Sequence, residues 1–199
     1  MKLAIVSGSH RKNSESHRVS LYLQSVLQKM GSEASVIDLG GNPLPLWSPE
    51  LFTDANFKAV WGPMAETLQA ADGLIVVSPE WGGMVPAGLK NFFLFCSNRE
   101  LAHKPGLIVS VSAGIGGTYP VAELRDSSYK NNRLCYIPDH VIVRNVNDVL
   151  KGDAPASDLD ASLRKRIDYS LKTFCKYAEA LTVVRAANLL DLENYPYGM

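Results

Sequence analysis

Short apolar runs, spaced along the chain and separated by longer stretches of mixed polarity, most constrain what this sequence can fold into. A strand buried on both faces of a parallel sheet is typically an unbroken run of about four to eight aliphatic residues. Such runs occupy residues 3–6, 74–77, 107–111 and 141–143, and a shorter alternating pattern covers residues 34–39. We therefore expect five buried strands.

The stretches between these runs have helical periodicity. Apolar residues from Val19 to Met30 recur at spacings of three and four, and Gly31 is a typical helix stop. A longer stripe of the same kind runs from Leu159 to Leu181 and indicates an amphipathic helix packed on the core. Alternating strands and helices predict a doubly wound α/β fold, a parallel sheet with helices on both faces.

Two prolines and the lack of any dividing segment complete this outline. Pro63 and Pro86 each stand where we expect a first helical turn to begin, because proline is tolerated there. No repeat, low-complexity tract or linker interrupts the sequence. We expect a single domain over residues 1–199, with residues 182–199 as a C-terminal tail.

Composition narrows the possible partners. Lysine plus arginine and aspartate plus glutamate each total 20, so no basic excess exists to bind nucleic acid. The first apolar run is too short for a signal peptide, and no stretch approaches the roughly 20 apolar residues of a membrane span. Cys96, Cys135 and Cys175 match no metal-ligand spacing and suit free thiols in a reducing compartment. We expect a cytoplasmic protein that binds no nucleic acid, membrane or metal.

The first strand is followed by SGSHRKNSESH, which has the chemistry of an anion site. In a doubly wound sheet, ligands bind beyond the carboxyl ends of the strands, here the loops at residues 7–17, 78–90 and 112–119. The first loop has neither the G-x-G-x-x-G motif nor a closing Gly-Lys-Ser/Thr. It leads into a helix whose first turn offers unpaired N–H groups, and Arg11 adds a planar charge suited to a phosphate monoester. The hydroxyl-bearing residues are Ser7, Ser9, Ser14 and Ser16.

A simpler interpretation of the first loop is also open. Ser14 or Asn13 can be a plain helix N-cap, and Arg11 can be a solvated surface charge.

The other two loops favour a flat ligand. Trp81, beside Gly82 and Gly83, either stacks on an aromatic ring or serves as a hydrophobic anchor. The following Lys90–Asn91 is expected on a helix surface. Glycines within residues 112–118 leave room for a ligand's edge to reach main-chain N–H groups. One loop that binds a phosphate and two loops that bracket a planar ring together fit FMN.

Three motifs in this order, GSHRKNS, SPEWGGMVPAGLKN and SAGIGGTYPVAELR, resemble those of the NADPH-dependent FMN reductase family. The resemblance covers residues 3 to about 145. It implies a flavodoxin-like fold with strand order 2-1-3-4-5, FMN as cofactor, and NADPH or NADH as hydride donor. The phosphate-binding residues that it implies are Ser9, Arg11, Ser14 and Ser16. The residues that it implies beside the flavin ring are Pro79, Glu80, Trp81, Gly82 and Gly83 at one edge and Ser112, Gly114 and Gly117 at the other.

The sequence departs from the family pattern at several positions. Trp81-Gly82 stands where the family usually has Tyr-Asn, so a side-chain amide near the flavin is missing. Leu94 replaces a commonly acidic residue within Phe92–Phe95, a run that is either core or a subunit contact. The tail from Leu192 onward lies outside the pattern and suggests docking on a neighbour. We expect a homodimer or homotetramer.

The favoured interpretation is an FMN-dependent NAD(P)H oxidoreductase. It would pass electrons by a ping-pong hydride mechanism to a small acceptor such as a flavin, quinone, azo compound or metal oxyanion, and the flavin would carry the chemistry. The four histidines show no metal-ligand spacing and are expected in surface or capping roles. The alternatives are a flavodoxin-type electron carrier, which the neutral charge disfavours because such carriers are typically acidic, and a non-catalytic flavin-binding sensor.

Overall fold

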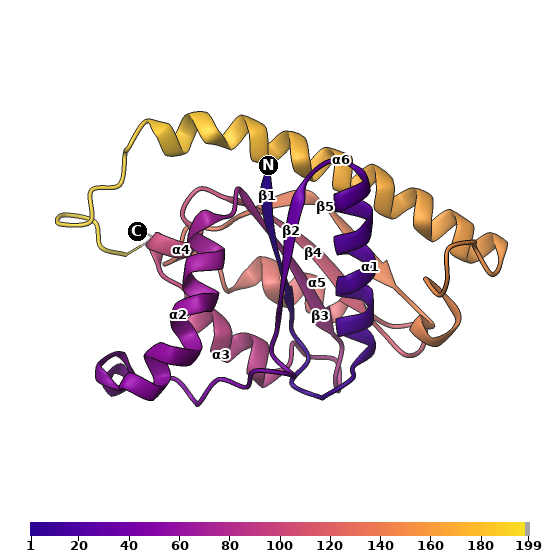
Figure 1. Cartoon of the computed structure of the whole chain (residues 1–199), viewed down its shortest axis with the longest axis horizontal. Coiled ribbons are helices and arrows are strands. Elements are labelled where there is room, and N and C mark those ends of the chain that lie inside the picture. The colour runs from indigo at the N-terminus through magenta and orange to yellow at the C-terminus, as the bar shows by residue number, and fades with distance from the viewer. Residues whose placement is uncertain (198–199) are drawn as a thin grey trace.

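A parallel sheet forms the centre of the molecule, and helices cover both of its faces (Figure 1). Residues 1–197, which the computed structural model describes, contain five strands. They are β1 (Lys2–Ser7), β2 (Glu33–Asp38), β3 (Gly73–Pro79), β4 (Pro105–Val111) and β5 (Cys135–Val143). They pair in the order β2-β1-β3-β4-β5, each pair parallel. The predicted strands and their order are confirmed.

The helices divide between the two faces of this sheet. On one face lie α1 (Glu15–Lys29) and α6 (Asp158–Ala186). On the other lie α2 (Ala55–Ala70), α3 (Ala87–Phe95), α4 (Asn98–Leu101) and α5 (Tyr119–Asp126). Two short 3-10 turns, η1 (Pro49–Thr53) and η2 (Val146–Asp148), lie in the connections. The fold is therefore doubly wound, as predicted.

Strand β1 is apolar without interruption because helices cover it on both sides. Leu3 and Ile5 belong to the core cluster shared with α1 and α6, whereas Ala4 and Val6 belong to the cluster shared with α2 and α3. All four side chains are at most 2% exposed. Burying a large aliphatic side chain contributes about 1.5–3 kcal/mol, so both faces of the strand add to stability.

The predicted helix start at Pro63 is wrong. Helix α2 begins at Ala55, where Asp54 is the N-cap and accepts hydrogen bonds from the N–H groups of Asn56 (2.6 Å) and Phe57 (3.0 Å). Pro63 lies inside the helix and is exposed. It removes one helical hydrogen bond, which the burial of the helix's apolar face offsets. Pro86, in contrast, is the residue directly before α3, close to the predicted start.

The Phe92–Phe95 run is mostly core. Its three phenylalanines are at most 7% exposed, and only Leu94 within it points outward, with 62% of its surface exposed. Asn91 was expected on the helix surface, but it is buried. Its amide accepts a hydrogen bond from the N–H of Trp47 (2.8 Å) and donates one to the carbonyl of Pro45 (2.7 Å). Asn91 thus fixes the connection that follows β2.

The C-terminal segment folds back on its own chain. Helix α6 continues to Ala186, five residues into the predicted tail. Beyond it, the chain turns toward α4 (Figure 1), and the guanidinium of Arg133 donates hydrogen bonds to the carbonyls of Tyr195 (2.7 Å) and Tyr197 (3.0 Å). This contact lies within one molecule, at the edge of the sheet where the strands begin. Residues 198–199 of the predicted tail lie outside the described residues.

The predicted free thiols are confirmed. Cys96, Cys135 and Cys175 form no disulfide within residues 1–197, and burial raises the pKa of each thiol. Over the same residues, no helix combines the length and the apolar character needed to cross a membrane.

Candidate functional site

Three predicted loops meet at the edge of the sheet where the strands end, the lower edge in Figure 1. They follow β1, β3 and β4, which are neighbours in the sheet. The strand order reverses between β1 and β3, where ligands bind in open α/β folds. We call residues 8–14 the first loop, residues 80–86 the second loop and residues 112–118 the third loop.

The first loop delivers the chain to the start of α1. Ser14 is the N-cap of that helix, and its Oγ accepts a hydrogen bond from the N–H of His17 (3.1 Å). Ser9 is fully buried, and its Oγ accepts one from the N–H of Arg11 (3.2 Å). Asn13 has a left-handed φ of 54°, which turns the chain into the helix. The simpler expectation that Ser14 is an N-cap is confirmed, although its hydroxyl proton remains available to donate.

The other residues predicted around the phosphate lie in or directly beside this loop and differ in accessibility. Arg11 is exposed, whereas Ser16 is buried in the first turn of α1. Ser7 is the last residue of β1, and its Oγ is buried without a hydrogen-bond partner within residues 1–197. The acid in the first helical turn, Glu15, receives a hydrogen bond from Nε of Arg18 (2.6 Å). This pairing offsets the repulsion that Glu15 would exert on an anion at the helix start.

A glycine after β2 supports the first loop from behind. A Cβ atom at Gly40 would lie 2.4 Å from the carbonyl oxygen of Arg11 and 3.2 Å from that of Ser9. Only glycine permits this close approach of two backbones. Gly40 was not among the predicted site residues, because nothing local to it indicates which distant segment it contacts.

The second loop is a tight β-turn closed on itself. The N–H and C=O groups of Trp81 and Met84 bond to each other in both directions, at 3.1 and 3.0 Å. Gly82 and Gly83 between them have φ values of 56° and 73°, which is why this two-residue turn contains two glycines. The indole of Trp81 packs edge-on against the imidazole of His10, with ring centroids 4.6 Å apart. This contact ties the second loop to the first.

The third loop is bonded to the second through Glu80. Its Oε2 accepts a hydrogen bond from the N–H of Gly117 (2.7 Å). Within the third loop, Oγ of Ser112 accepts one from the N–H of Gly114 (3.3 Å). The carboxylate of Glu80 is thus engaged by the protein itself, a link between two predicted site residues that sequence reasoning missed. Pro79, directly before Glu80, is buried as the last residue of β3.

Helix α5 supports the second loop from the outside. Oε2 of Glu123 accepts a hydrogen bond from the N–H of Val85 (2.6 Å), and its other oxygen pairs with Nζ of Lys90. Burial alone would raise the pKa of Glu123, but these two donors outweigh it, and the pKa lies below its usual value. The carboxylate therefore remains charged near neutral pH.

An open hollow of about 460 Å³ adjoins the second loop. Gly83 and Met84 line one part of it, and Tyr119 at the start of α5 lines another. Met84 and Tyr119 are 55% and 67% exposed. Glu123 and Asp126 of α5 also line it. The apolar part formed by Met84 and Tyr119 suits one face of a flat organic molecule. Met84 and Tyr119 were not among the predicted site residues.

The donors at this edge fit FMN better than a metal ion. The first turn of α1 offers N–H groups without intrahelical partners, and Ser14 and Arg11 add donors beside them, which suits a phosphate. The second and third loops offer main-chain groups and glycines at which a ring could approach. Within residues 1–197, no cluster of three or more histidine, cysteine, aspartate or glutamate side chains could hold a metal ion.

The fold and the site together define a flavodoxin-like protein. The chain belongs to the NADPH-dependent FMN reductase family, whose model matches residues 1–148. The resemblance predicted from the three motifs is thereby confirmed.

Several named proteins are similar to this chain. A 2-hydroxy-1,4-benzoquinone reductase from Burkholderia sp. is 33% identical over 59% of this chain and 64% of its own. A quinone reductase from Escherichia coli (strain K12) is 32% identical over 58% and 63%. An NADPH azoreductase from Bacillus sp. (strain OY1-2) is 29% identical over 57% and 60%. The chain thus spans less than two thirds of the length of these curated relatives.

A solved structure shares the fold over nearly the whole chain. The flavoenzyme NAD(P)H:(acceptor) oxidoreductase FerB from Paracoccus denitrificans superposes with a TM-score of 0.71, covering 90% of this chain and 97% of that one. The sequence identity is 18%, so this similarity concerns the fold alone.

Proposed function

We propose that this chain is an FMN-dependent NAD(P)H oxidoreductase that passes electrons to a small acceptor such as a flavin, a quinone, an azo compound or a metal oxyanion. Family membership and the names of the relatives support this proposal. The single observation that carries it is that the three strand-end loops are in direct contact with one another. His10 contacts Trp81, and Glu80 receives the N–H of Gly117.

Each loop would have a separate task. The first turn of α1, with Ser9, Ser14, Ser16 and Arg11, would hold the phosphate of FMN. The second loop, from Pro79 through Glu80 to Gly83, would border one edge of the ring. Ser112, Gly114 and Gly117 would border the other edge. Bound FMN would supply the redox chemistry, since its ring can accept a hydride from a reduced nicotinamide and give electrons to an acceptor.

The residues of the chain itself would position and shield the ring. The Glu80–Gly117 hydrogen bond keeps the second and third loops at a fixed separation. Trp81, held by His10, would wall the ring from the side of the first loop. Met84 and Tyr119 would line the path of the substrates, because they lie exposed beside the second loop.

Two alternatives to an oxidoreductase would also bind a flavin at this site. A flavodoxin-type carrier or a non-catalytic sensor would use the same three loops. The wall formed by Met84 and Tyr119 favours the enzyme, because a pure electron carrier needs no space for a small substrate. The neutral net charge also disfavours a carrier that docks on charged partners.

Replacing Arg11 with alanine tests the phosphate assignment. We expect the variant to bind FMN more weakly by about 1.5–3 kcal/mol, the range for hydrogen bonds to charged groups, and to bind riboflavin as the wild type does. The wild type itself should bind FMN far more tightly than riboflavin. Fluorescence-quenching titrations with both flavins measure these affinities. Equal affinity of the wild type for the two flavins would refute the phosphate site.

The kinetic order of the reaction tests the enzyme assignment. We expect the nicotinamide and the acceptor to use the same open side of the site in turn, because the second and third loops, joined by the Glu80–Gly117 hydrogen bond, would take up the ring's edges. Initial rates with NADPH and a quinone should then give parallel double-reciprocal lines. NADPH alone should bleach the protein's flavin absorbance under anaerobic conditions. Intersecting lines would exclude the ping-pong order, and a flavin that stays oxidised in excess NADPH and NADH would favour the carrier or the sensor.

We also propose that the chain forms a homodimer or homotetramer. Leu94 and Tyr129 are 62% and 42% exposed and line a hollow of about 440 Å³ between α3 and the end of α5. The Leu94→Lys variant should have a lower mass in solution than the wild type, closer to that of the monomer, because a charge would have to be buried at the subunit contact. Size-exclusion chromatography with light scattering measures the mass. A wild type that is monomeric at high concentration would contradict the proposal.

A further inference from the structure

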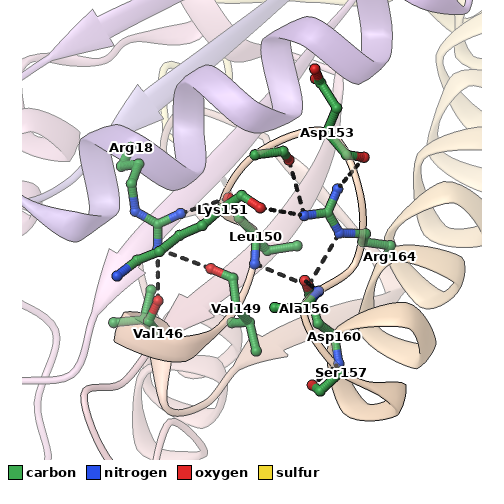
Figure 2. Close-up of polar contacts among 11 residues, drawn as sticks. Arg18, Val146, Val149, Leu150, Lys151, Asp153, Ala156, Ser157, Asp160 and Arg164 are labelled. Atoms are coloured by element: carbon green, nitrogen blue, oxygen red, sulfur yellow. Dashed lines mark hydrogen bonds and ion pairs between the residues drawn. The ribbon is translucent and has the colours of Figure 1, made fainter.

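Arg18, one turn into α1, reaches across to a distant segment of the chain. Its guanidinium donates hydrogen bonds to the carbonyl oxygens of Val146 (2.7 Å), Val149 (3.2 Å) and Leu150 (2.8 Å) (Figure 2). Its Nε also donates to Glu15 at the start of the same helix. Arg18 is partly buried, and its three carbonyl acceptors lie more than 120 residues away in the sequence. It therefore makes a fixed connection, because guanidinium donors have a rigid planar geometry.

Arg18 holds the segment of residues 144–153, and this segment also supports the third loop of the site. The N–H of Val146 donates to the carbonyl of Ser112 (3.1 Å), and the N–H of Asn145 donates to that of Gly114 (2.9 Å). Nε of Arg144 donates to the carbonyl of Gly116 (3.0 Å). Three consecutive residues of one segment therefore fix the backbone of the third loop. Val146 is the shared residue, since its carbonyl binds Arg18 and its N–H binds Ser112.

This segment needs external support. Asn145 and Leu150 have left-handed φ values of 45° and 57°, which are unfavourable for residues with side chains and persist only when the surroundings impose them. Arg18 binds the carbonyl of Leu150, and Oδ1 of Asp160 accepts its N–H (3.0 Å). Figure 2 shows Arg18 on one side of the segment and Arg164 with Asp160 on the other.

The two arginines hold different parts of it. Arg164 donates to the carbonyls of Lys151, Gly152 and Asp153, each at 3.1 Å, and to Asp160. None of these acceptors bonds to the third loop among the contacts of residues 1–197. Of the two arginines, only Arg18 binds a residue, Val146, that is itself hydrogen-bonded to the third loop in the described part of the chain.

We propose that Arg18 is a positioning residue of the flavin site. It joins the helix whose first turn would hold the phosphate to the loop that would border the ring, through Val146. This inference rests on the proposed function for the identity of the ligand. Because Arg18 acts on the ring side of the site, its removal should weaken the binding of any flavin, with or without a phosphate. That pattern differs from the one expected for Arg11.

The test compares Arg18→Met with Arg164→Met, a matched control that removes the other arginine whose guanidinium binds carbonyls of this segment. Titrations with FMN and with riboflavin are made on the wild type and on both variants. Hydrogen exchange of the apo-proteins reports separately on the amides of residues 112–118 and 145–146. We expect Arg18→Met to weaken riboflavin binding by about tenfold. FMN binding should fall by at least as much, because Glu15 at the helix start also loses its partner. The variant should also speed exchange in both segments. Arg164→Met should lower the melting temperature but leave flavin affinity and exchange at residues 112–118 unchanged.

Other outcomes would overturn the inference. Loss of FMN affinity without loss of riboflavin affinity would mean that Arg18 acts only on the phosphate. Equal losses in the two variants would mean general loosening of the chain, and unchanged exchange at residues 112–118 would break the proposed link. Arg18→Lys, which keeps the charge, is measured in the same way if Arg18→Met does not fold. A wild type that binds no flavin would instead refute the proposed function, whereas the exchange result would still decide whether Arg18 positions the third loop.

Discussion

Replacing Asp160 with alanine is expected to lower the free energy of unfolding by about 3–5 kcal/mol, the range for removing one partner of a buried ion pair. Asp160 is fully buried and receives hydrogen bonds from the N–H groups of Leu150 and Ala156 (both 3.0 Å) and from Arg164 (3.2 Å). The variant would leave these donors without an acceptor. Because typical domains are stable by about 5–15 kcal/mol, urea unfolding should reveal the loss clearly.

The effect of Asp160 should depend on pH in a defined direction. Burial alone would raise the pKa of this carboxyl group, but the N–H groups of Ala156 and Leu150 and the guanidinium of Arg164 outweigh burial and hold the pKa below its usual value. A lowered pKa in the folded state stabilises the protein at pH values above the unfolded pKa of about 3.9. The stability difference between wild type and variant should therefore be full near neutral pH and should shrink as the pH falls through the folded pKa.

Asp158→Ala is the matched control for this prediction. Asp158 lies in the same first turn of α6 but is exposed. Its removal should cost only the favourable interaction with the helix dipole, about 0.3–1 kcal/mol. Equal losses in the two variants, or a difference that does not change with pH, would show that the buried hydrogen bonds of Asp160 do not hold the segment.

The layout of the fold could be predicted because it depends on local patterns. Helices cover β1, β3 and β4 on both faces, and such strands must be apolar at every position, so their runs stand out in the sequence. The two glycines of the second loop indicated a turn for a similar reason, since a backbone with positive φ favours glycine at each position. The start of α2 was missed because the prediction relied on Pro63, whereas the helix begins eight residues earlier, after the N-cap Asp54.

The contacts that assemble the site could not be predicted in the same way. Glu80 and Gly117 were both expected beside the flavin, but no local pattern shows that one would bind the other. Arg18 looks like an ordinary polar residue of an amphipathic helix until the fold brings Val146 next to it. Asn91 is polar, as surface residues usually are, yet it is buried and its hydrogen-bond partners lie in the connection after β2. Each of these contacts joins segments whose proximity only the folded chain reveals.

Gly40→Ala is expected to weaken FMN binding by about 1.5–3 kcal/mol, roughly ten- to a hundredfold, the range for losing a hydrogen bond to a charged group. The added Cβ would lie 2.4 Å from the carbonyl oxygen of Arg11, so this oxygen would have to retreat to about 3.4 Å to reach ordinary contact. The atoms in the way belong to the backbone of the first loop and cannot simply rotate aside. The loop that would hold the phosphate must therefore move.

The neighbouring glycine provides a control within one residue. A Cβ at Gly41 would meet only Asp38, whose side-chain oxygen at 3.1 Å can shift by rotation. Gly41→Ala should therefore bind both FMN and riboflavin with nearly the wild-type affinity. Gly40→Ala should lose much more affinity for FMN than for riboflavin. Fluorescence titrations with the two flavins, together with melting temperatures, separate loss of the site from loss of the fold. If Gly40→Ala keeps its FMN affinity while remaining folded, the first loop has room to spare, and the phosphate assignment of residues 9–16 loses its structural support.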